Sequence, residues 1–287
     1  MAAPRPPQRL PRPSKQLRCG RFELPLDRPL VMGVVNVTPD SFSDGGRYLD
    51  PQAAIAHARR LMEEGADVID IGGESTRPGA MDVSEQQELG RILPVVEALH
   101  DLPVSVDTRR PAVMKAALDA GASMINDVDA LSAPGALAAV AKSECAICLM
   151  HKKGEPAKMQ QDPQYRDVVG EVKSFLNNRV KFSIEGGIDA ERLIVDPGFG
   201  FGKTGAHNLT LLKHLRELSD LPILAGLSRK STLGAITGRP AGERLAGSLA
   251  MVLLALQAGA TMLRVHDVKE TRDVIAVWQA YEGGLKK

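Results

Sequence analysis

A polar loop follows the first long apolar run of the chain. Residues 30–35 are apolar, Asn36 ends the run, and residues 37–46 are rich in hydroxyls, carboxylates, proline and glycine. A polar loop between a strand end and a helix is where α/β proteins usually keep their chemistry. The pair Asp50-Pro51 then favours a helix start, with Asp as the N-cap and Pro at the first helical position. We therefore expect a functional loop beginning at Asn36.

Polar side chains also end the other apolar runs. A single aspartate after a strand is most often a cap or a loop brace, and we expect that of Asp127 and Asp267. Asp70 is expected to brace the mouth that these strand ends form. The whole set is more informative than any member, because the ends of parallel strands meet along one edge. Its members are Asn36, Asp70, Asp107, Asn126, Asp127, His151, Asp196, Ser228, Lys230, Arg264, His266 and Asp267.

Part of this set suits the recognition of a flat heterocycle. Asp107, Asn126 and Asp196 can accept hydrogen bonds from an edge rich in N–H groups, such as that of an amino-pyrimidinone. Lys230 can donate to a ring carbonyl or nitrogen, and Arg264 can stack its planar cation on the ring face. The sequence therefore predicts a floor that binds a heterocycle.

A second group suits a diphosphate at the rim of the same site. It consists of Asn36, Arg77, Arg264 and His266. Arginine is the bidentate partner of phosphate oxygens, and Mg²⁺ prefers oxygen ligands together with substrate phosphates.

A glycine-rich motif at residues 196–204, Asp-Pro-Gly-Phe-Gly-Phe-Gly-Lys-Thr, resembles a phosphate loop. The P-loop pattern requires glycine five positions before Gly202, and Pro197 occupies that position. The motif is therefore not that of an ATPase. We expect its glycines to let the backbone approach a flat ligand.

An internal repeat indicates which elements position these residues. Three segments share a Gly-Ala pair, an apolar run and a polar end, at residues 65–70, 121–126 and 259–264. Glycine at a helix end that leads into a short buried strand is typical of an αβ unit. Eight strands are expected, starting near Leu30, Asp67, Pro103, Ser123, Cys145, Arg192, Pro222 and Thr261. The helices are expected at residues 51–64, 84–100, 109–120, 134–142, 164–185, 206–217, 240–258 and 268–281.

Eight β–α units in about 260 residues predict an α/β fold, the (β/α)8 TIM barrel. An open doubly wound sheet is the alternative, but no G-x-G-x-x-G motif follows the first strand. Residues 17–28 are expected to form a short N-terminal hairpin. Residues 1–16, with five prolines and four basic residues, are expected to form a disordered tail. Residues 17–287 then form a single domain.

Composition argues against several other classes. The net charge of +1 and an aromatic content of 3% oppose a nucleic-acid surface, and no segment has the apolar length of a membrane span. Cys145 and Cys148 form a C-x-x-C pair within an apolar run, so we expect core cysteines rather than a redox or zinc pair. Three cysteines without a signal-peptide pattern favour the reducing cytoplasm.

Several segments resemble, in the same order, the motifs of the dihydropteroate synthase family, which are pterin-binding enzymes of folate biosynthesis. They are residues 36–46, 72–79, 106–108, 125–127, 149–151, 196–203, 228–231 and 264–266, and the resemblance covers about residues 17–282. It implies a transferase that joins (7,8-dihydropterin-6-yl)methyl diphosphate to 4-aminobenzoate and releases diphosphate. It also implies Mg²⁺, a homodimer and inhibition by sulfonamides.

The resemblance also implies a role for particular residues. The pterin would meet Asp107, Asn126, Asp196, Lys230 and a stacked Arg264. The diphosphate would meet Asn36, Arg77, Arg264 and His266, with Mg²⁺ held at Asn36. The 4-aminobenzoate would meet Thr76, Arg77, Pro78, Phe201, Lys230 and Ser231. The catalytic residues would be Asp107, Asp196, Lys230 and Asn36. Lys152 and Lys153 depart from the family pattern, in which an uncharged residue follows His151, and could alter the wall of the pterin pocket.

Two other functions would use part of this set. A methyltransferase that moves a methyl group from a reduced folate to a corrinoid would share the pterin floor. It would have no use for a diphosphate rim or for the Ser-Arg-Lys-Ser motif at residues 228–231. A non-catalytic pterin or anion binder would be expected to lack rim or floor residues, and Asn36, Arg77, Lys230 and Arg264 are all present.

Overall fold

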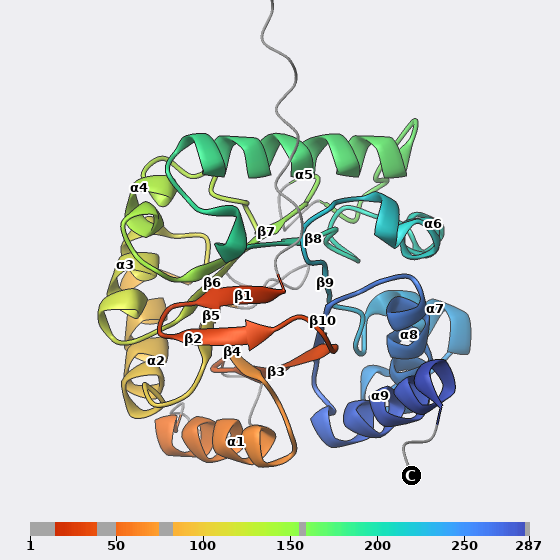
Figure 1. Ribbon diagram of the computed structural model, residues 1–287, viewed down its shortest axis with the longest axis horizontal. Helices are drawn as coiled ribbons and strands as arrows, with labels where there is room; N and C mark the ends of the chain where they lie inside the picture. The colour runs from red at the N-terminus through yellow and green to blue at the C-terminus, as the bar shows by residue number, and fades with distance from the viewer. Residues whose placement is uncertain (1–14, 39–49, 75–82, 155–158, 285–287) are drawn as a thin grey trace, which may run out of the picture.

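The computed structural model describes residues 15–38, 50–74, 83–154 and 159–284. Parallel strands form a barrel in the order β8-β7-β6-β5-β4-β3-β10-β9, and a bridge between Val195 and Ile223 closes it (Figure 1). The strands are β3 (Leu30–Asn36), β4 (Val68–Gly72), β5 (Val104–Asp107), β6 (Met124–Asp127), β7 (Ala146–Met150), β8 (Leu193–Asp196), β9 (Leu224–Ala225) and β10 (Met262–Val265). The predicted (β/α)8 barrel is confirmed.

Helices surround this barrel (Figure 1). The described α-helices are α1 (Pro51–Glu63), α2 (Glu85–Ala98), α3 (Pro111–Asp119), α4 (Ala136–Ala141), α5 (Val168–Glu185), α6 (Gly205–Lys213), α7 (Ser231–Thr237), α8 (Leu245–Gln257) and α9 (Val268–Gly283). Short 3₁₀ turns lie at η1 (Ala190–Arg192), η2 (Leu215–Glu217) and η3 (Ala241–Glu243).

Local sequence explains where several helices begin. Asp50 accepts a hydrogen bond of 2.9 Å from the Gln52 amide, and Pro51 occupies the first helical position of α1. Ser84 and Gln87 form the predicted capping box of α2. Each cap satisfies backbone N–H groups that have no partner inside the helix.

Two predicted helices are each divided into two elements, the helix expected at 164–185 begins only at Val168, and one helix was not predicted. The segment expected at 206–217 is α6 followed by η2, and the segment expected at 240–258 is η3 followed by α8. The sequence did not predict α7, because seven residues with an internal glycine at 234 are too few for a clear helical period. The strand starts were correct to within two residues.

The inward side chains of the barrel change character from one end to the other. At the lower level they are apolar and include Leu30, Val68, Met124, Ile194 and Met262. Side chains two residues apart on a strand point to the same face. The inward positions two residues after Val68, Met124, Ile194 and Met262 are polar, namely Asp70, Asn126, Asp196 and Arg264. The strand period therefore turns these polar side chains into the barrel interior at its C-terminal mouth.

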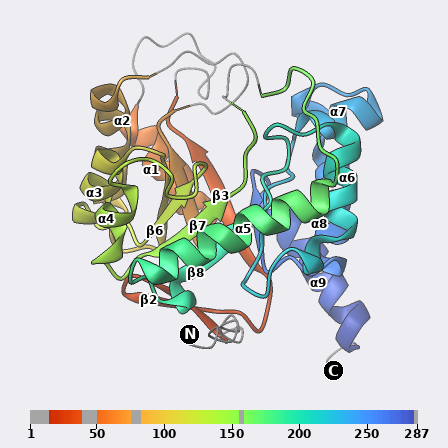
Figure 2. The same cartoon turned by 90° about the horizontal axis from the view of Figure 1, so that it is seen from above.

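An antiparallel hairpin covers the opposite end of the barrel (Figures 1 and 2). It consists of β1 (Gln16–Cys19) and β2 (Phe22–Pro25), as the sequence predicted. Leu17, Cys19 and Leu24 are buried against the lower apolar residues of the barrel. None of the described helices is long and apolar enough to cross a membrane.

Candidate active site

Arg264 on β10 lies at the centre of the barrel mouth. Its Nε donates to Asp70 Oδ2 at 2.6 Å, and its Nη2 donates to Asp107 Oδ2 at 3.0 Å. The guanidinium therefore joins β10 to β4 and β5 across the interior. The sequence assigned Arg264 to ligand stacking, whereas the structure also gives it two carboxylate partners.

Asp70 confirms its expected role as a brace. Its side chain is fully buried and accepts hydrogen bonds from Ser105 Oγ at 2.6 Å and Asn126 Nδ2 at 3.2 Å. With Arg264 included, Asp70 connects four strands. A buried carboxylate is tolerated when such partners satisfy its oxygens.

Asp107 has a different environment, because part of its side chain reaches the mouth. Burial raises the pKa of Asp107 to about 7, and the neighbouring Arg264 opposes that rise. Burial lowers the pKa of Arg264, but the carboxylates of Asp70 and Asp107 raise it by more, so that it lies above its ordinary value. Arg264 therefore stays charged while Asp107 can change protonation near neutral pH.

Asn126 presents an acceptor to the site. Its Nδ2 is used by Asp70, while its buried Oδ1 has no hydrogen-bond partner within the described part of the chain. A buried acceptor without a partner costs about 1–3 kcal/mol. A ligand N–H placed over Asn126 would remove that cost.

Asp196 ends β8 beside the glycine-rich loop. Its Oδ1 accepts a hydrogen bond of 2.6 Å from the Gly198 amide, which fixes the carboxylate. Burial raises the pKa of Asp196, and Lys230 is the strongest opposing influence. Asp107, Asn126 and Asp196 thus share the inner end of the mouth, as the sequence predicted from their strand positions.

Lys230 immediately precedes α7 and points toward the glycine-rich loop. Its Nζ donates to the backbone oxygen of Phe199 and lies 4.7 Å from the centroid of the Phe201 ring. Gly200, at φ +80°, leaves room for the stem of Lys230, since a Cβ there would lie 3.4 Å from its Cδ. Burial lowers the pKa of Lys230 to about 8, and Asp196 opposes this.

His266 stands at the end of β10, above Arg264. Its Nδ1 lies 3.0 Å from Ser228 Oγ, which also receives the His266 amide at 3.4 Å. Arg229 pairs with Asp267 and so ties the β9–α7 loop to the end of β10.

Asp267 fixes a loop and makes no side-chain cap for α9. Asp127 likewise braces its loop by accepting from two backbone amides.

Asn36, Gly72 and Asp107 lie at one level across three neighbouring strands. A Cβ at Gly72 would lie 3.8 Å from both Asn36 Oδ1 and Asp107 Cβ, so the glycine leaves these two side chains facing a common space. Asn36 therefore offers one amide oxygen to a cation. Within the described ranges, no three His, Cys, Asp or Glu side chains are grouped to hold a metal on their own. This donor set fits Mg²⁺ only if substrate phosphates supply further oxygens.

The other expected site residues are distributed as follows. Phe201 lies beside Lys230, and Ser231 is exposed at the first position of α7. Thr76, Arg77 and Pro78 lie outside the described residues. Arg110 binds Glu74 at 3.0 Å and the Val83 oxygen at 2.6 Å, and so connects the residues that flank this gap.

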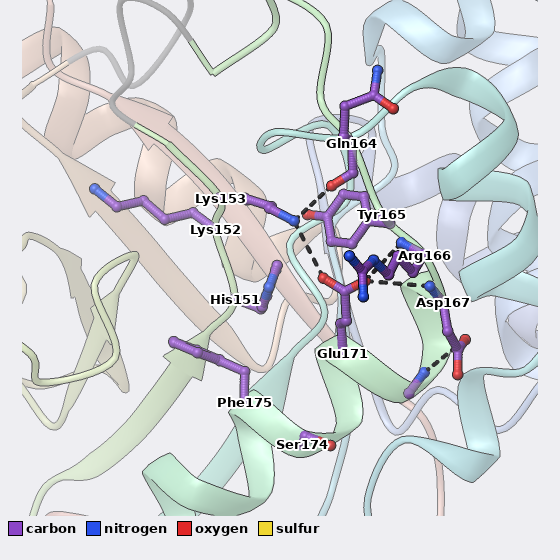
Figure 3. A pocket seen from close by; sticks show the side chains of 11 residues that line it. His151, Lys152, Lys153, Gln164, Tyr165, Arg166, Asp167, Glu171, Ser174 and Phe175 are labelled. Carbon is purple, nitrogen blue, oxygen red and sulfur yellow. Dashed lines mark hydrogen bonds and ion pairs between the residues drawn. The ribbon is translucent and has the colours of Figure 1, made fainter.

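The two lysines after β7 point in different directions (Figure 3). Lys152 pairs with Asp129 at 2.5 Å, whereas Lys153 pairs with Glu171 at 3.2 Å and donates to the Gln164 oxygen at 2.6 Å. Lys153 borders an open cavity of about 1180 Å³ between β7 and α5, which Tyr165 and Phe175 also line. None of Asp70, Asp107, Asn126, Asp196 and Arg264 lines this cavity.

One buried group was missed by the sequence analysis. Lys203, at the end of the glycine-rich motif, is 2% exposed. The sequence indicated a turn that approaches a flat ligand at this motif, and it gave Lys203 no role of its own. The signal that could have identified a structural lysine is the alternation of three glycines before it, which lets backbone oxygens turn inward.

The comparisons with known proteins agree with this geometry. The model of the pterin binding enzyme family matches residues 32–266. The dihydropteroate synthase of Neisseria meningitidis serogroup B is 50% identical over 274 residues, which are 92% of this chain and 96% of that relative.

Solved structures agree as well. The structure of Xanthomonas albilineans dihydropteroate synthase with 4-aminobenzoic acid has a TM-score of 0.89 at 54% identity and covers 94% of this chain and 99% of its own. The Burkholderia cenocepacia dihydropteroate synthase complexed with 7,8-dihydropteroate has a TM-score of 0.86 at 47% identity, covering 93% and 96%. With the acceptor-rich mouth of the barrel, these matches place the chain in the dihydropteroate synthases of the pterin-binding enzyme family.

Proposed function

We propose that the chain is a transferase that condenses (7,8-dihydropterin-6-yl)methyl diphosphate with 4-aminobenzoate to give 7,8-dihydropteroate and diphosphate. The observation that carries this proposal is the ring of acceptors around Arg264: Asp107, Asn126 Oδ1 and Asp196 all face the barrel mouth. The names of relatives that align over most of both chains support it.

The pterin is assigned to the inner end of the mouth. Its N–H groups would donate to Asp107, Asn126 and Asp196, and Lys230 would donate to a ring acceptor. Arg264 would lie against the ring face while Asp70 and Asp107 hold its guanidinium. The unpaired oxygen of Asn126 supports this orientation.

The diphosphate is assigned to the outer level of the mouth. His266 stands above Arg264 and is held by Ser228, and Asn36 ends the neighbouring strand, β3. Arg77 is proposed as a further partner from its sequence position. Mg²⁺, held by Asn36 and the diphosphate oxygens, would neutralise charge on the leaving group.

The 4-aminobenzoate is assigned to the wall formed by Phe201, Lys230 and Ser231, and by Thr76, Arg77 and Pro78 from their sequence positions. The ammonium of Lys230 can meet the substrate carboxylate, while the Phe201 ring packs on the aryl ring. Lys230 would thereby stand between the two substrates.

The reaction then follows from placement and charge. The C–O bond between the pterin methylene and the diphosphate breaks, and Arg264 and His266 stabilise the departing negative charge. The carboxylates of Asp107 and Asp196 favour the positive charge that remains on the pterin. The amine of 4-aminobenzoate attacks the methylene, the C–N bond forms, and the amine loses its proton. The arylamine is a weak nucleophile, so its placement supplies much of the rate.

One experiment separates this function from the alternatives. Purified protein is mixed with the pterin diphosphate, 4-aminobenzoate and Mg²⁺, and the products are identified by mass spectrometry. Equal amounts of 7,8-dihydropteroate and diphosphate are expected. Methyl transfer from a reduced folate to a corrinoid, or binding of the pterin without any product, would contradict the proposal.

We further propose that the enzyme is a homodimer, paired through the face formed by α6, α7 and α8. These neighbouring helices carry exposed apolar side chains, namely Leu209, Ile236, Leu245, Leu253 and Leu254. Exposed apolar patches of this kind often mark an interface. Sedimentation velocity should give a dimer, and Ile236→Glu should give a monomer. A monomer of the unchanged protein would rule the dimer out.

We also propose that the protein is located in the cytoplasm. Cys19, Cys145 and Cys148 are buried as free thiols, which is ordinary for a reducing compartment. Fractionation of cells that express the protein, with a marker for each compartment, tests this location.

A further inference from the structure

Lys203 is a buried amine that the roles proposed above do not use. Burial lowers the pKa of Lys203 to about 7, and Asp196 opposes this. Its Nζ lies 2.9 Å from the Gly198 oxygen, 3.0 Å from the Phe201 oxygen and 3.3 Å from the His151 oxygen. His151 Nδ1 lies 2.9 Å away as a further partner. Lys203 therefore holds the loop at residues 197–204 to the end of β7.

His151 is suited to accept from this lysine. Burial and the nearby Lys203 lower the pKa of His151 to about 3, so the imidazole is neutral at physiological pH and Nδ1 offers a lone pair. Its ring packs edge-on against Phe175 at 4.9 Å between centroids, and Tyr165 lies close by (Figure 3). The acceptor is therefore fixed by its surroundings.

The loop packs so closely on residues 151–153, which follow β7, that only glycine fits at two positions. Gly198, at φ +68°, would place a Cβ 1.9 Å from the His151 oxygen, and Gly202, at φ +64°, would place one 2.1 Å from the Lys153 oxygen. Tyr165 adds a hydrogen bond of 2.9 Å from its hydroxyl to the Gly202 oxygen. These contacts hold this side of the loop against the residues that follow β7.

The other side of the loop faces the active site. The Phe199 oxygen accepts from Lys230, and the Phe201 ring lies 4.7 Å from the Lys230 Nζ. The backbone oxygens of Gly198 and Phe201 accept from Lys203, while the Phe199 oxygen and the Phe201 ring contact Lys230, so Phe201 contacts both lysines. A shift on one side of the loop moves the other, because only a few backbone bonds separate the two sides.

We propose that Lys203 is a positioning residue for the half of the site that receives the second substrate. By gathering backbone oxygens on the β7 side, it holds Phe199 and Phe201 against Lys230. The inference rests on the proposed function, which assigns 4-aminobenzoate to this wall. Two of the three residues of the pterin floor, Asp107 and Asn126, lie on β5 and β6, away from this loop. The third, Asp196, accepts from the Gly198 amide of the loop. The binding of the pterin should therefore depend on Lys203 less than that of 4-aminobenzoate does.

The test compares Lys203→Met with Lys213→Met, an exposed lysine at the end of α6. Methionine keeps the length of the side chain but cannot donate to the backbone oxygens. Steady-state rates should show the KM for 4-aminobenzoate rising about tenfold or more in Lys203→Met. The KM for the pterin diphosphate should change much less, and Lys213→Met should match the unchanged enzyme. Equal changes in both KM values, or no change in either, would overturn the proposal.

Two further measurements cover the other outcomes. If Lys203→Met does not fold, Tyr165→Phe removes a milder restraint on the same loop and should raise only the KM for 4-aminobenzoate. If the unchanged protein makes no dihydropteroate, the proposed function fails but the restraint can still be measured. Acetylation of Lys230, followed by peptide mass spectrometry, should then be faster in either loop variant than in Lys213→Met. An unchanged rate would show that Lys203 does not control Lys230.

Discussion

Asp70 and Arg264 are 194 residues apart in the sequence and form an ion pair of 2.6 Å in the middle of the barrel. Asp70 is fully buried, while Arg264 is partly open to the mouth. One side of the guanidinium is therefore anchored and the other can meet a ligand. The pair joins the second strand of the barrel to its last strand, and so connects the stability of the fold with the binding site.

Asp70→Asn should destabilise the protein by about 3–5 kcal/mol, because it leaves the largely buried positive charge of Arg264 with Asp107 as its remaining carboxylate partner. Urea unfolding followed by circular dichroism measures the change. Asp101→Asn is the matched control, since Asp101 forms an exposed pair with Arg59. The control should leave the free energy of unfolding nearly unchanged. Equal changes in the free energy of unfolding for the two variants would mean that the buried pair stabilises the fold no more than the exposed pair does.

Asp196→Ala should abolish measurable pterin binding while the protein stays folded. Each hydrogen bond from a ring N–H to this carboxylate is worth about 1.5–3 kcal/mol. Calorimetry with the pterin diphosphate measures the loss, and Asp189→Ala, at an exposed site, serves as the control. Unchanged affinity in the folded variant would remove Asp196 from the pterin site.

The pH dependence of kcat/KM should have two limbs. Asp107 has a pKa raised to about 7, so acid conditions protonate it and remove a negative charge that favours the cationic pterin. Lys230 has a pKa lowered to about 8, so alkaline conditions remove its proton and its ability to bind a carboxylate. The rate should therefore fall below about pH 7 and above about pH 8. Lys230→Arg should move the alkaline limb upward, and an unmoved limb would assign it to another group.

His266→Ala should weaken the binding of diphosphate more than that of a dihydropterin without phosphates. The imidazole stands above Arg264 and is oriented by Ser228, at the level assigned to the leaving group. Competition calorimetry with the two ligands gives the two affinities. A similar loss for both would place His266 outside the diphosphate site.

A sulfonamide with a para-amino group should inhibit the enzyme in competition with 4-aminobenzoate, because the two molecules share an aryl ring, an amine and an anionic end. Initial rates at several concentrations of each substrate test this. Competition with the pterin diphosphate instead would mean that the wall near Phe201 is wrongly assigned.

The sequence predicted the barrel and the floor of the site because both depend on local patterns. Strand period places Asp107, Asn126 and Asp196 on the inner face, and the β–α repeat places them at one end. It did not predict the pairing of Asp70 with Arg264, since two strands distant in the sequence become close only when the barrel closes. It also missed the function of Lys203, because the three glycines before it were interpreted as room for a ligand and not as a turn that directs backbone oxygens toward the lysine.

The hairpin at the bottom of the barrel limits how substrates and products reach and leave the site. Leu17, Cys19 and Leu24 pack beneath the inner apolar residues, so substrates enter and products leave by the mouth above. In the proposed arrangement the pterin occupies the inner end of this passage, and the diphosphate and 4-aminobenzoate lie further out. The pterin substrate must then bind first, because 4-aminobenzoate that enters an empty site blocks the path of the pterin to the inner end. Excess 4-aminobenzoate would accordingly slow the enzyme when the pterin substrate is scarce.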